Sequence, residues 1–152
     1  FQLKYSMDTV KKVIARTDVL IVNLEEAEKI LNTNLAKEKS VSALIHKLLV
    51  TGAKEVVITD GAQGAWSGNE EEIFYLKSFP ITVVAKTGAG DAFSSGYMAA
   101  RINGHDIQTA LSWGIANSCG VISEHGPHKG LLDKKGIQKM LAKYANIIPT
   151  AV

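Results

Sequence analysis

The sequence contains Ile-Thr-Val-Val-Ala-Lys-Thr-Gly-Ala-Gly-Asp-Ala-Phe at residues 81–93. The apolar run at its start predicts a buried strand over 81–84, and a helical pattern follows to about Ile102. Between them lies a turn of small residues, here called the glycine turn, made of Gly88, Ala89 and Gly90. Such residues let backbone N–H groups approach a ligand closely, and the unpaired N–H groups of a helix start favour an anion. The stretch therefore predicts a phosphate-binding turn.

Asp91 follows the glycine turn directly, although its carboxylate would repel a phosphate. One interpretation is that Asp91 caps the helix. The other is that the turn holds a phosphoryl group in transit while Asp91 takes a proton from the attacking hydroxyl. A Walker loop and a nucleophile elbow do not fit the spacing, and Phe93 stands where a dinucleotide fingerprint needs glycine.

Strands and helices alternate outward from this stretch. Further strands are predicted at 19–22 and 55–59, a β-hairpin at 65–76, and helices at about 6–16, 24–31, 41–51, 107–123 and 134–144. This alternation is typical of a layered α/β sheet, in which ligands bind beyond the carboxyl ends of the strands. Three turns are expected at that edge, after Val22, Thr59 and Val84.

Two further motifs follow the first two strands. Asn23-Leu-Glu-Glu26 has the pattern of a capping box, with Asn at the N-cap and Glu at the third helical position. Thr59-Asp-Gly61-Ala-Gln-Gly64 by itself could be a plain hairpin turn. Both motifs would lie at the same sheet edge as the glycine turn.

Taken together, the three motifs resemble those of the ribokinase/PfkB family of carbohydrate kinases. Residues 83–93 are similar to its C-terminal signature, Asp-Thr-x-Gly-Ala-Gly-Asp-x-Phe, and the upstream motifs are similar to its Asn-x-x-Glu and Thr-x-Gly-x-x-Gly. The resemblance implies a ribokinase-like α/β fold, a three-layer α/β/α sandwich whose N-terminal part is missing. Residues 1–152 would form a single nucleotide-binding and catalytic domain of a longer kinase.

The resemblance also implies a function and residue roles. ATP and Mg²⁺ would be used to phosphorylate a hydroxyl of a sugar or related small alcohol, with Asp91 as general base and the glycine turn as anion hole. The remaining roles implied are contacts to nucleotide and metal: Asn23 beside the phosphates, Glu26 on the water shell of Mg²⁺, Thr59 and Gly61 at the phosphates, Gly64 completing their turn, and Asn117, or Ile115 in its place, near adenine.

The signature departs from the family pattern at two positions. Ala85 replaces an aspartate that helps bind an activating monovalent cation in many members, which puts that cation in doubt here. Lys86 replaces the threonine, and either supplies the missing positive charge or is a solvated surface residue. The altered pair also favours an alternative, a non-catalytic nucleotide-sensing domain derived from a kinase.

Composition limits the other possibilities. The chain has 46% hydrophobic and 21% charged residues and a net charge of +2, an ordinary globular mixture without the basic stripe of a nucleic-acid binder. No apolar run approaches the roughly 18 residues that span a membrane. The single cysteine, Cys119, suits a reducing cytosol, so a cytoplasmic location is expected.

Several alternatives stay open at this stage. A nucleoside kinase of the same fold, or an α/β enzyme that acts on another phosphorylated ligand, fits the same motifs. The acceptor is not determined, because nothing in the chain resembles the N-terminal half that carries most sugar contacts in the family. A homodimer is one option for its assembly.

Overall fold

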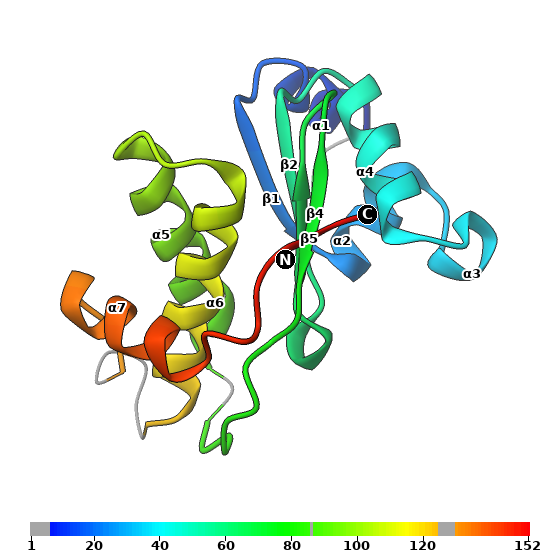
Figure 1. Ribbon diagram of the computed structural model, residues 1–152. Helices are drawn as coiled ribbons and strands as arrows, with labels where there is room; N and C mark the ends of the chain where they lie inside the picture. Colours follow the sequence, from blue (N-terminus) through cyan, green and yellow to red (C-terminus); the bar gives the residue numbers. More distant parts are fainter. Residues whose placement is uncertain (1–6, 86, 125–129) are drawn as a thin grey trace. The chain divides into compact units, whose positions relative to one another are not determined.

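The computed structural model describes residues 7–85, 87–124 and 130–152 (Figure 1). Ser6, expected to cap the first helix, and Lys86 lie outside the described residues. The chain divides into two compact units. Unit 1 comprises residues 1–60, 66–73 and 152, and unit 2 comprises residues 61–65 and 74–151. The described strands form one sheet in the order β1-β2-β3-β4-β5.

Unit 1 contains the first parallel strand pair and the helices around it. Its elements are α1 (Met7–Ile14), β1 (Val19–Asn23), α2 (Leu24–Leu31), α3 (Leu35–Glu38), α4 (Val41–Val50) and β2 (Glu55–Thr59), with most of β3 (Ala65–Gly68). The strands β1 and β2 are parallel, in a register that places Asn23 opposite Thr59. The predicted parallel arrangement is therefore confirmed for this pair, and the ends of both strands reach the same edge.

The helix α4 supplies much of the core of unit 1. Its predicted apolar face is buried throughout: Val41, Leu44, Ile45, Leu48 and Leu49. Ser40 caps the start through the N–H of Ala43, as predicted. After the helix, Gly52 has a φ of +112°, and a Cβ there would lie 2.7 Å from Ala15 Cα. Glycine is therefore needed at Gly52 both for the left-handed backbone and for the close approach of the chain.

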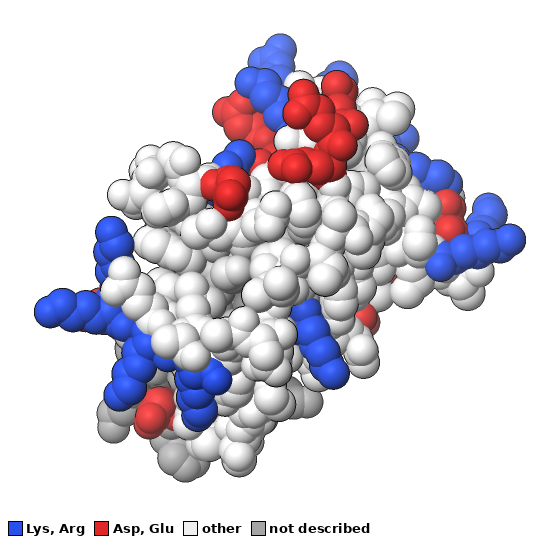
Figure 2. Space-filling view, viewed as in Figure 1, with Lys and Arg blue, Asp and Glu red and all other residues white. Residues whose placement is uncertain are grey.

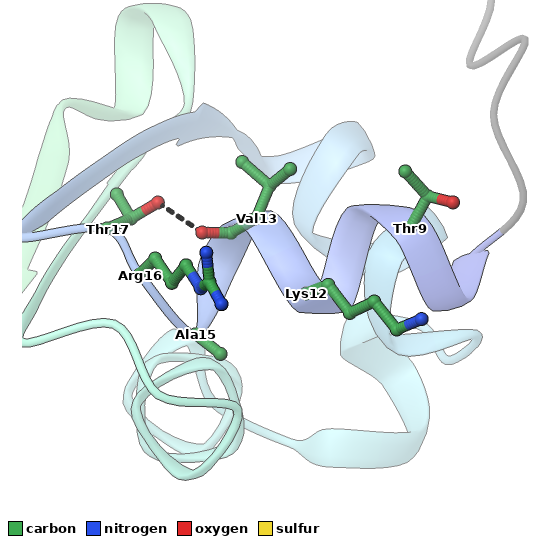
Figure 3. A pocket seen from close by; sticks show the side chains of 6 residues that line it. All are labelled: Thr9, Lys12, Val13, Ala15, Arg16 and Thr17. Carbon is green, nitrogen blue, oxygen red and sulfur yellow. Dashed lines mark hydrogen bonds between the residues drawn. The ribbon is translucent and has the colours of Figure 1, made fainter.

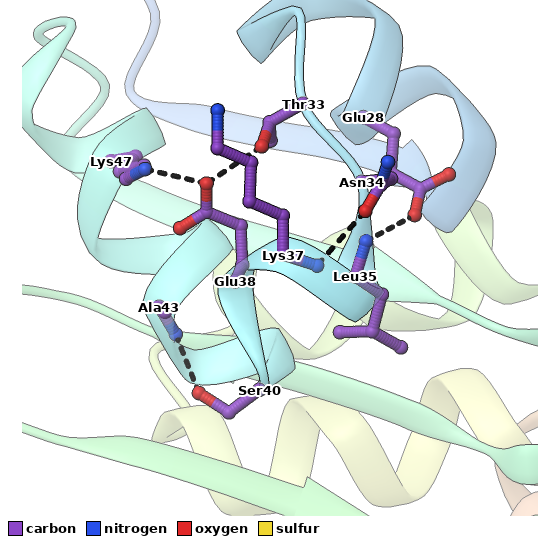
Figure 4. A network of polar contacts seen from close by, with 9 residues as sticks. All are labelled: Glu28, Thr33, Asn34, Leu35, Lys37, Glu38, Ser40, Ala43 and Lys47. Carbon is purple, nitrogen blue, oxygen red and sulfur yellow. Dashed lines mark hydrogen bonds and ion pairs between the residues drawn. The ribbon is translucent and has the colours of Figure 1, made fainter.

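The short helix α3 is not predicted from the sequence, and polar contacts hold it (Figure 4). Glu38 accepts hydrogen bonds from Lys47 Nζ at 2.7 Å and Thr33 Oγ1 at 2.6 Å. The bond from Lys47, with that from Thr33, lowers the pKa of the Glu38 carboxyl. Glu28 accepts from the N–H of Leu35 at 2.6 Å. Because these contacts join residues five to nine positions apart, no helical period in the sequence reveals them.

Unit 2 is mainly helical. It contains the 3-10 turn Gly61–Gln63, most of β4 (Ile73–Leu76), and then α5 (Ala89–Ile102), α6 (Ile107–Ile122), α7 (Lys134–Lys143) and β5 (Thr150–Ala151). Two glycines bring α5 and α6 close together. A Cβ on Gly96 would lie 2.8 Å from the Trp113 carbonyl oxygen, and one on Gly114 would lie 2.8 Å from the ring of Phe93.

The strand predicted over 81–84 is wrong. These residues have no regular secondary structure, and Val83 and Val84 are 48% and 40% exposed. The N–H of Val84 donates to the carbonyl oxygen of Ile122 at 2.8 Å, at the end of α6. An apolar run becomes a strand only where a neighbouring strand accepts its backbone hydrogen bonds. Here the backbone is instead tied to a helix end, and Pro80 supplies no N–H.

The surface is mixed in charge. On the face drawn in Figure 2, Lys and Arg side chains occur in separate small groups, and acidic side chains lie among them. Of the helices in the described part of the chain, none is long and apolar enough to cross a membrane.

Candidate functional site

The carboxyl ends of β1 and β2 carry the first group of predicted site residues. Asn23 ends β1 and caps α2: its Oδ1 accepts from the N–H of Glu26 at 2.8 Å, and Glu26 Oε2 accepts from the N–H of Asn23 at 3.0 Å. This reciprocal pair confirms the predicted capping box. Since Asn23 pairs with Thr59 in the sheet register, the structure brings the predicted residues Asn23, Glu26 and Thr59 together in unit 1.

Glu26 can hold a metal ion through water. It is half-buried, and its cap uses Oε2, whereas a carboxylate has two oxygens that accept hydrogen bonds. Among the described residues, no group of three or more His, Cys, Asp or Glu side chains could form a direct metal cage. Mg²⁺ usually keeps several of its waters and takes one or two carboxylates from the protein. The residues present therefore fit a hydrated Mg²⁺ held by its water shell.

The 61–64 turn in unit 2 depends on two glycines. Gly61 has a φ of +48° and open space where a Cβ would stand. Gly64 has a φ of +107°, and a Cβ there would collide with the carbonyl oxygen of Leu76. Tyr75 supports the turn by donating from its hydroxyl to the Gln63 carbonyl oxygen at 2.7 Å. The turn is therefore an ordered stretch of backbone with an open side at Gly61.

The start of α5 carries the glycine turn. Gly88 is the N-cap residue, with a φ of 85°, in the left-handed region that glycine adopts without strain. No side chain among the described residues caps this end, and the first helical bond runs from the N–H of Ala92 to the carbonyl oxygen of Gly88. The N–H groups of the glycine turn therefore precede the helical ladder. A Cβ on Gly90 would meet open space, so a ligand can approach.

Asp91 is the third residue of α5, and its side chain is exposed. The interpretation of Asp91 as the helix cap is wrong, because Gly88 is the N-cap and α5 has no side-chain cap. Its carboxylate therefore lies in the first helical turn, one residue beyond the uncapped N–H groups. This is the arrangement that the second interpretation requires, with anion donors and a base in one turn.

Asn117, the residue expected near adenine, is buried within unit 2. Its side chain is 4% exposed, and its Nδ2 donates to the carbonyl oxygen of Ala92 at 2.8 Å and to Ser95 Oγ at 3.1 Å. Its Oδ1 accepts from the N–H of Leu132 at 2.9 Å. Ile115, the alternative for that role, is also buried. The sequence does not identify Ser95 or Leu132 as partners, because they are 22 and 15 positions away.

A hollow that the sequence does not predict lies at the end of α1 (Figure 3). It is lined by Thr9, Lys12, Val13, Ala15, Arg16 and Thr17, and Thr17 Oγ1 donates to the Val13 carbonyl oxygen at 2.9 Å. None of these lining residues is a predicted site residue. Within unit 1 the described structure brings Asn23, Glu26 and Thr59 together, and unit 2 carries the turn at Gly61 and Gly64 and the start of α5.

The model of the pfkB family carbohydrate kinase matches residues 2–134 of this chain. The chain belongs to the PfkB family. This PfkB chain is 34% identical over 109 residues to the ATP-dependent 6-phosphofructokinase of Thermoanaerobacterium thermosaccharolyticum, covering 72% of the chain and 32% of the relative. It is 28% identical to the 5-dehydro-2-deoxygluconokinase of Bacillus subtilis, covering 85% of the chain and 39% of the relative. It is also 28% identical to the cytidine kinase of Thermococcus kodakarensis, covering 78% of the chain and 42% of the relative. The chain therefore spans about a third to two fifths of these relatives.

Solved structures agree on the fold of this PfkB chain. An E. coli protein provisionally assigned as ribokinase II, solved with ATP and Mg²⁺, has a TM-score of 0.78 at 27% identity, covering 90% of this chain and 43% of its own. The Arabidopsis thaliana ribokinase complexed with ribose and ATP has a TM-score of 0.79 at 22% identity, covering 86% and 43%. The predicted ribokinase-like α/β fold is confirmed, and the chain spans less than half of each structure.

Proposed function

We propose that this chain is the nucleotide-binding and catalytic part of a longer ATP-dependent kinase, which transfers the γ-phosphoryl group to a hydroxyl of a sugar or related small alcohol. The observation that carries the proposal is the start of α5. Its first N–H groups have no side-chain cap, and the exposed carboxylate of Asp91 lies in the same turn. Phosphoryl transfer needs this combination of oriented donors and one positioned base.

In the proposed reaction, the acceptor hydroxyl oxygen forms a bond to the γ-phosphorus while the bond between that phosphorus and the oxygen of ADP breaks. The proton of the hydroxyl passes to the carboxylate of Asp91. The N–H groups of the glycine turn stabilise the negative charge on the phosphoryl oxygens in the transition state. These donors are fixed by the helix, so they need no reorganisation when the charge develops.

The nucleotide and metal roles are assigned to the two strand ends. Asn23 and Thr59 lie side by side in the β1–β2 register, beyond which we place the phosphates. Glu26 would hold waters of Mg²⁺, and the ion when bound would neutralise phosphate charge. The turn at Gly61 and Gly64 would meet the phosphates through its backbone. We predict that the kinase does not depend on a monovalent cation, because Ala85 replaces the aspartate that helps bind this cation in many members of the family.

The first prediction tests Asp91 in the intact kinase. Asp91→Asn keeps the size of the side chain but removes the base, so turnover should fall by about 10²–10⁴-fold while ATP binding persists. Turnover is measured as ADP release and binding by calorimetry. The matched control is Asp133→Asn at the start of α7, where Asn caps as well as Asp and turnover should be unchanged. Normal turnover in Asp91→Asn would contradict the proposed mechanism.

A screen of sugars and nucleosides against the intact kinase, followed by ADP release, is the experiment that finds the acceptor. Relatives of both kinds, a 6-phosphofructokinase and a cytidine kinase, support including both classes. The second candidate function is nucleotide sensing without catalysis, favoured by the Ala85-Lys86 departure from the family signature. ATP-dependent thermal stabilisation with no ADP release across the screen would favour sensing.

A further inference from the structure

Asn117 on α6 makes a buried set of contacts that its expected role at adenine does not explain. We infer that Asn117 is a positioning residue for Asp91: its side-chain amide joins the first turns of α5 to α6 and to the segment 130–132. The inference rests on the proposed function of Asp91 as the base. It concerns residues within unit 2 alone.

The hydrogen bonds leave the amide nitrogen no further donor for a nucleotide. An Asn amide has two N–H donors, and those of Asn117 go to the Ala92 carbonyl oxygen and Ser95 Oγ. Its oxygen accepts from the N–H of Leu132. Because a carbonyl oxygen only accepts and a backbone N–H only donates, the two ends of the amide cannot be exchanged. The side chain is therefore held in one orientation by its neighbours.

Gly96 makes this contact possible from the α5 side. A Cβ at Gly96 would lie 2.8 Å from the Trp113 carbonyl oxygen and 3.0 Å from Asn117 Cβ. Because Gly96 has no Cβ, α6 approaches closely enough for Asn117 to reach a carbonyl group within the first turns of α5. Ser95 completes a closed triangle, since its Oγ donates to the same Ala92 carbonyl oxygen at 3.0 Å while it accepts from Asn117.

A second close approach fixes the other partner of Asn117. A Cβ at Gly120 would lie 2.5 Å from the Gly130 carbonyl oxygen and 2.8 Å from Leu132 Cγ. The segment 130–132 therefore lies directly against α6, and it runs back along the helix, since Gly130 contacts Gly120 and Leu132 contacts Asn117. Asn117 thus stands between this segment and α5.

The hydrogen bond from Asn117 is made one residue beyond the proposed base. Ala92, whose carbonyl oxygen accepts from Asn117, follows Asp91 directly, and the start of α5 has no side-chain cap. Because the start of α5 has no side-chain cap, a contact from the neighbouring helix adds a restraint on the position of the carboxylate in its first turn. A misplacement of about 1 Å at a reacting group can lower a rate by about 10²-fold. Asn117 supplies such a restraint from the buried face of the helix.

The second prediction tests this role with Asn117→Leu in the intact kinase, a change that keeps the branched shape and the number of side-chain heavy atoms but removes all three hydrogen bonds. We expect kcat to fall by about tenfold or more while the KM for ATP changes less than about twofold. Ser95→Ala, which removes two of the three hydrogen bonds of the triangle but keeps the one from Asn117 to the Ala92 carbonyl oxygen, should lower kcat in the same direction by a smaller factor. The matched control is Asn103→Ala, which removes a hydrogen bond from a side-chain amide to the Ala99 carbonyl oxygen near the end of α5 and should leave kcat unchanged.

The outcomes separate this inference from others. A raised KM for ATP with unchanged kcat would show that Asn117 contacts the nucleotide and would overturn the inference. A lowered melting temperature with unchanged kcat well below it would show a merely structural role and would also overturn it. If Asn117→Leu does not fold, the kcat of Ser95→Ala decides. If Asp91→Asn keeps its turnover, the proposed function has failed; if Asp91→Asn is inactive but both other variants have normal kcat, only this inference has failed.

Discussion

The helix α2 begins with a side-chain cap, whereas α5 begins with a bare glycine. Asn23 and Glu26 satisfy each other's backbone N–H groups at the first start, while Gly88 offers no side chain at the second. A side-chain cap typically stabilises a helix by about 1 kcal/mol. The helix α5 therefore lacks this stabilisation, and its first N–H groups stay accessible to a ligand. The following three variants test this difference between the two helix starts.

The largest expected effect comes from placing a carboxylate at the start of α5. Gly88→Asp places a negative charge beside the N–H groups of the glycine turn and repels phosphate, so turnover in the intact kinase should fall by at least about 100-fold. Gly104→Asp is the matched control for backbone strain, because Gly104 has a similar φ of +80° and open space around it, after α5 has ended. If Gly88→Asp released ADP as fast as the unchanged kinase, the proposed anion hole would be contradicted.

A smaller effect is expected when the cap of α2 is removed. Asn23→Ala should lower the free energy of unfolding by about 1 kcal/mol, because the N–H of Glu26 loses its acceptor. Asn23→Asp keeps an acceptor and should leave stability nearly unchanged. Denaturant titration of both variants measures the difference. Equal stability of Asn23→Ala and the parent would mean that the contrast between the two helix starts is not energetic.

The smallest effect concerns pH and the cap of α6. Hydrogen bonds from Thr109 lower the pKa of Asp106 below its ordinary value of 3.8: first that of the Thr109 side chain, then that of its backbone N–H, which donates to Asp106 Oδ1 at 2.8 Å. Folding favours the charged form of Asp106. Its contribution to the free energy of unfolding is therefore fully present above the ordinary pKa and is lost as the pH falls through the lowered pKa of the folded state. Asp106→Asn caps without titrating, so stability below about pH 4 should depend less on pH, by less than about 1 kcal/mol. An unchanged pH dependence of the melting temperature would contradict this cause.

Local patterns in the sequence predicted much of the fold. The capping box at Asn23 needs residues only three positions apart, and the buried face of α4 follows a helical period. The positions of Gly52 and Gly61 follow from the backbone conformations that glycine tolerates. Such features depend on nearest neighbours along the chain, which the sequence displays directly.

Predictions that needed distant partners were less successful. The run over 81–84 has the composition of a strand, but its backbone bonds to the end of α6. The helix α3 depends on Lys47, nine positions beyond Glu38. Asn23 and Thr59 come together through sheet register, and the partners of Asn117 lie on α5 and at Leu132.

The sequence alone determined the capping box that starts α2, the apolar face of α4, and that Asp91 follows a turn of small residues. These properties depend on residues within one helical turn of each other. Only the tertiary structure decided that Asp91 is not a cap, that the 81–84 run is not a strand, and that Asn117 faces α5. Each of these depends on which distant group completes a hydrogen bond, and that choice is made when the chain packs.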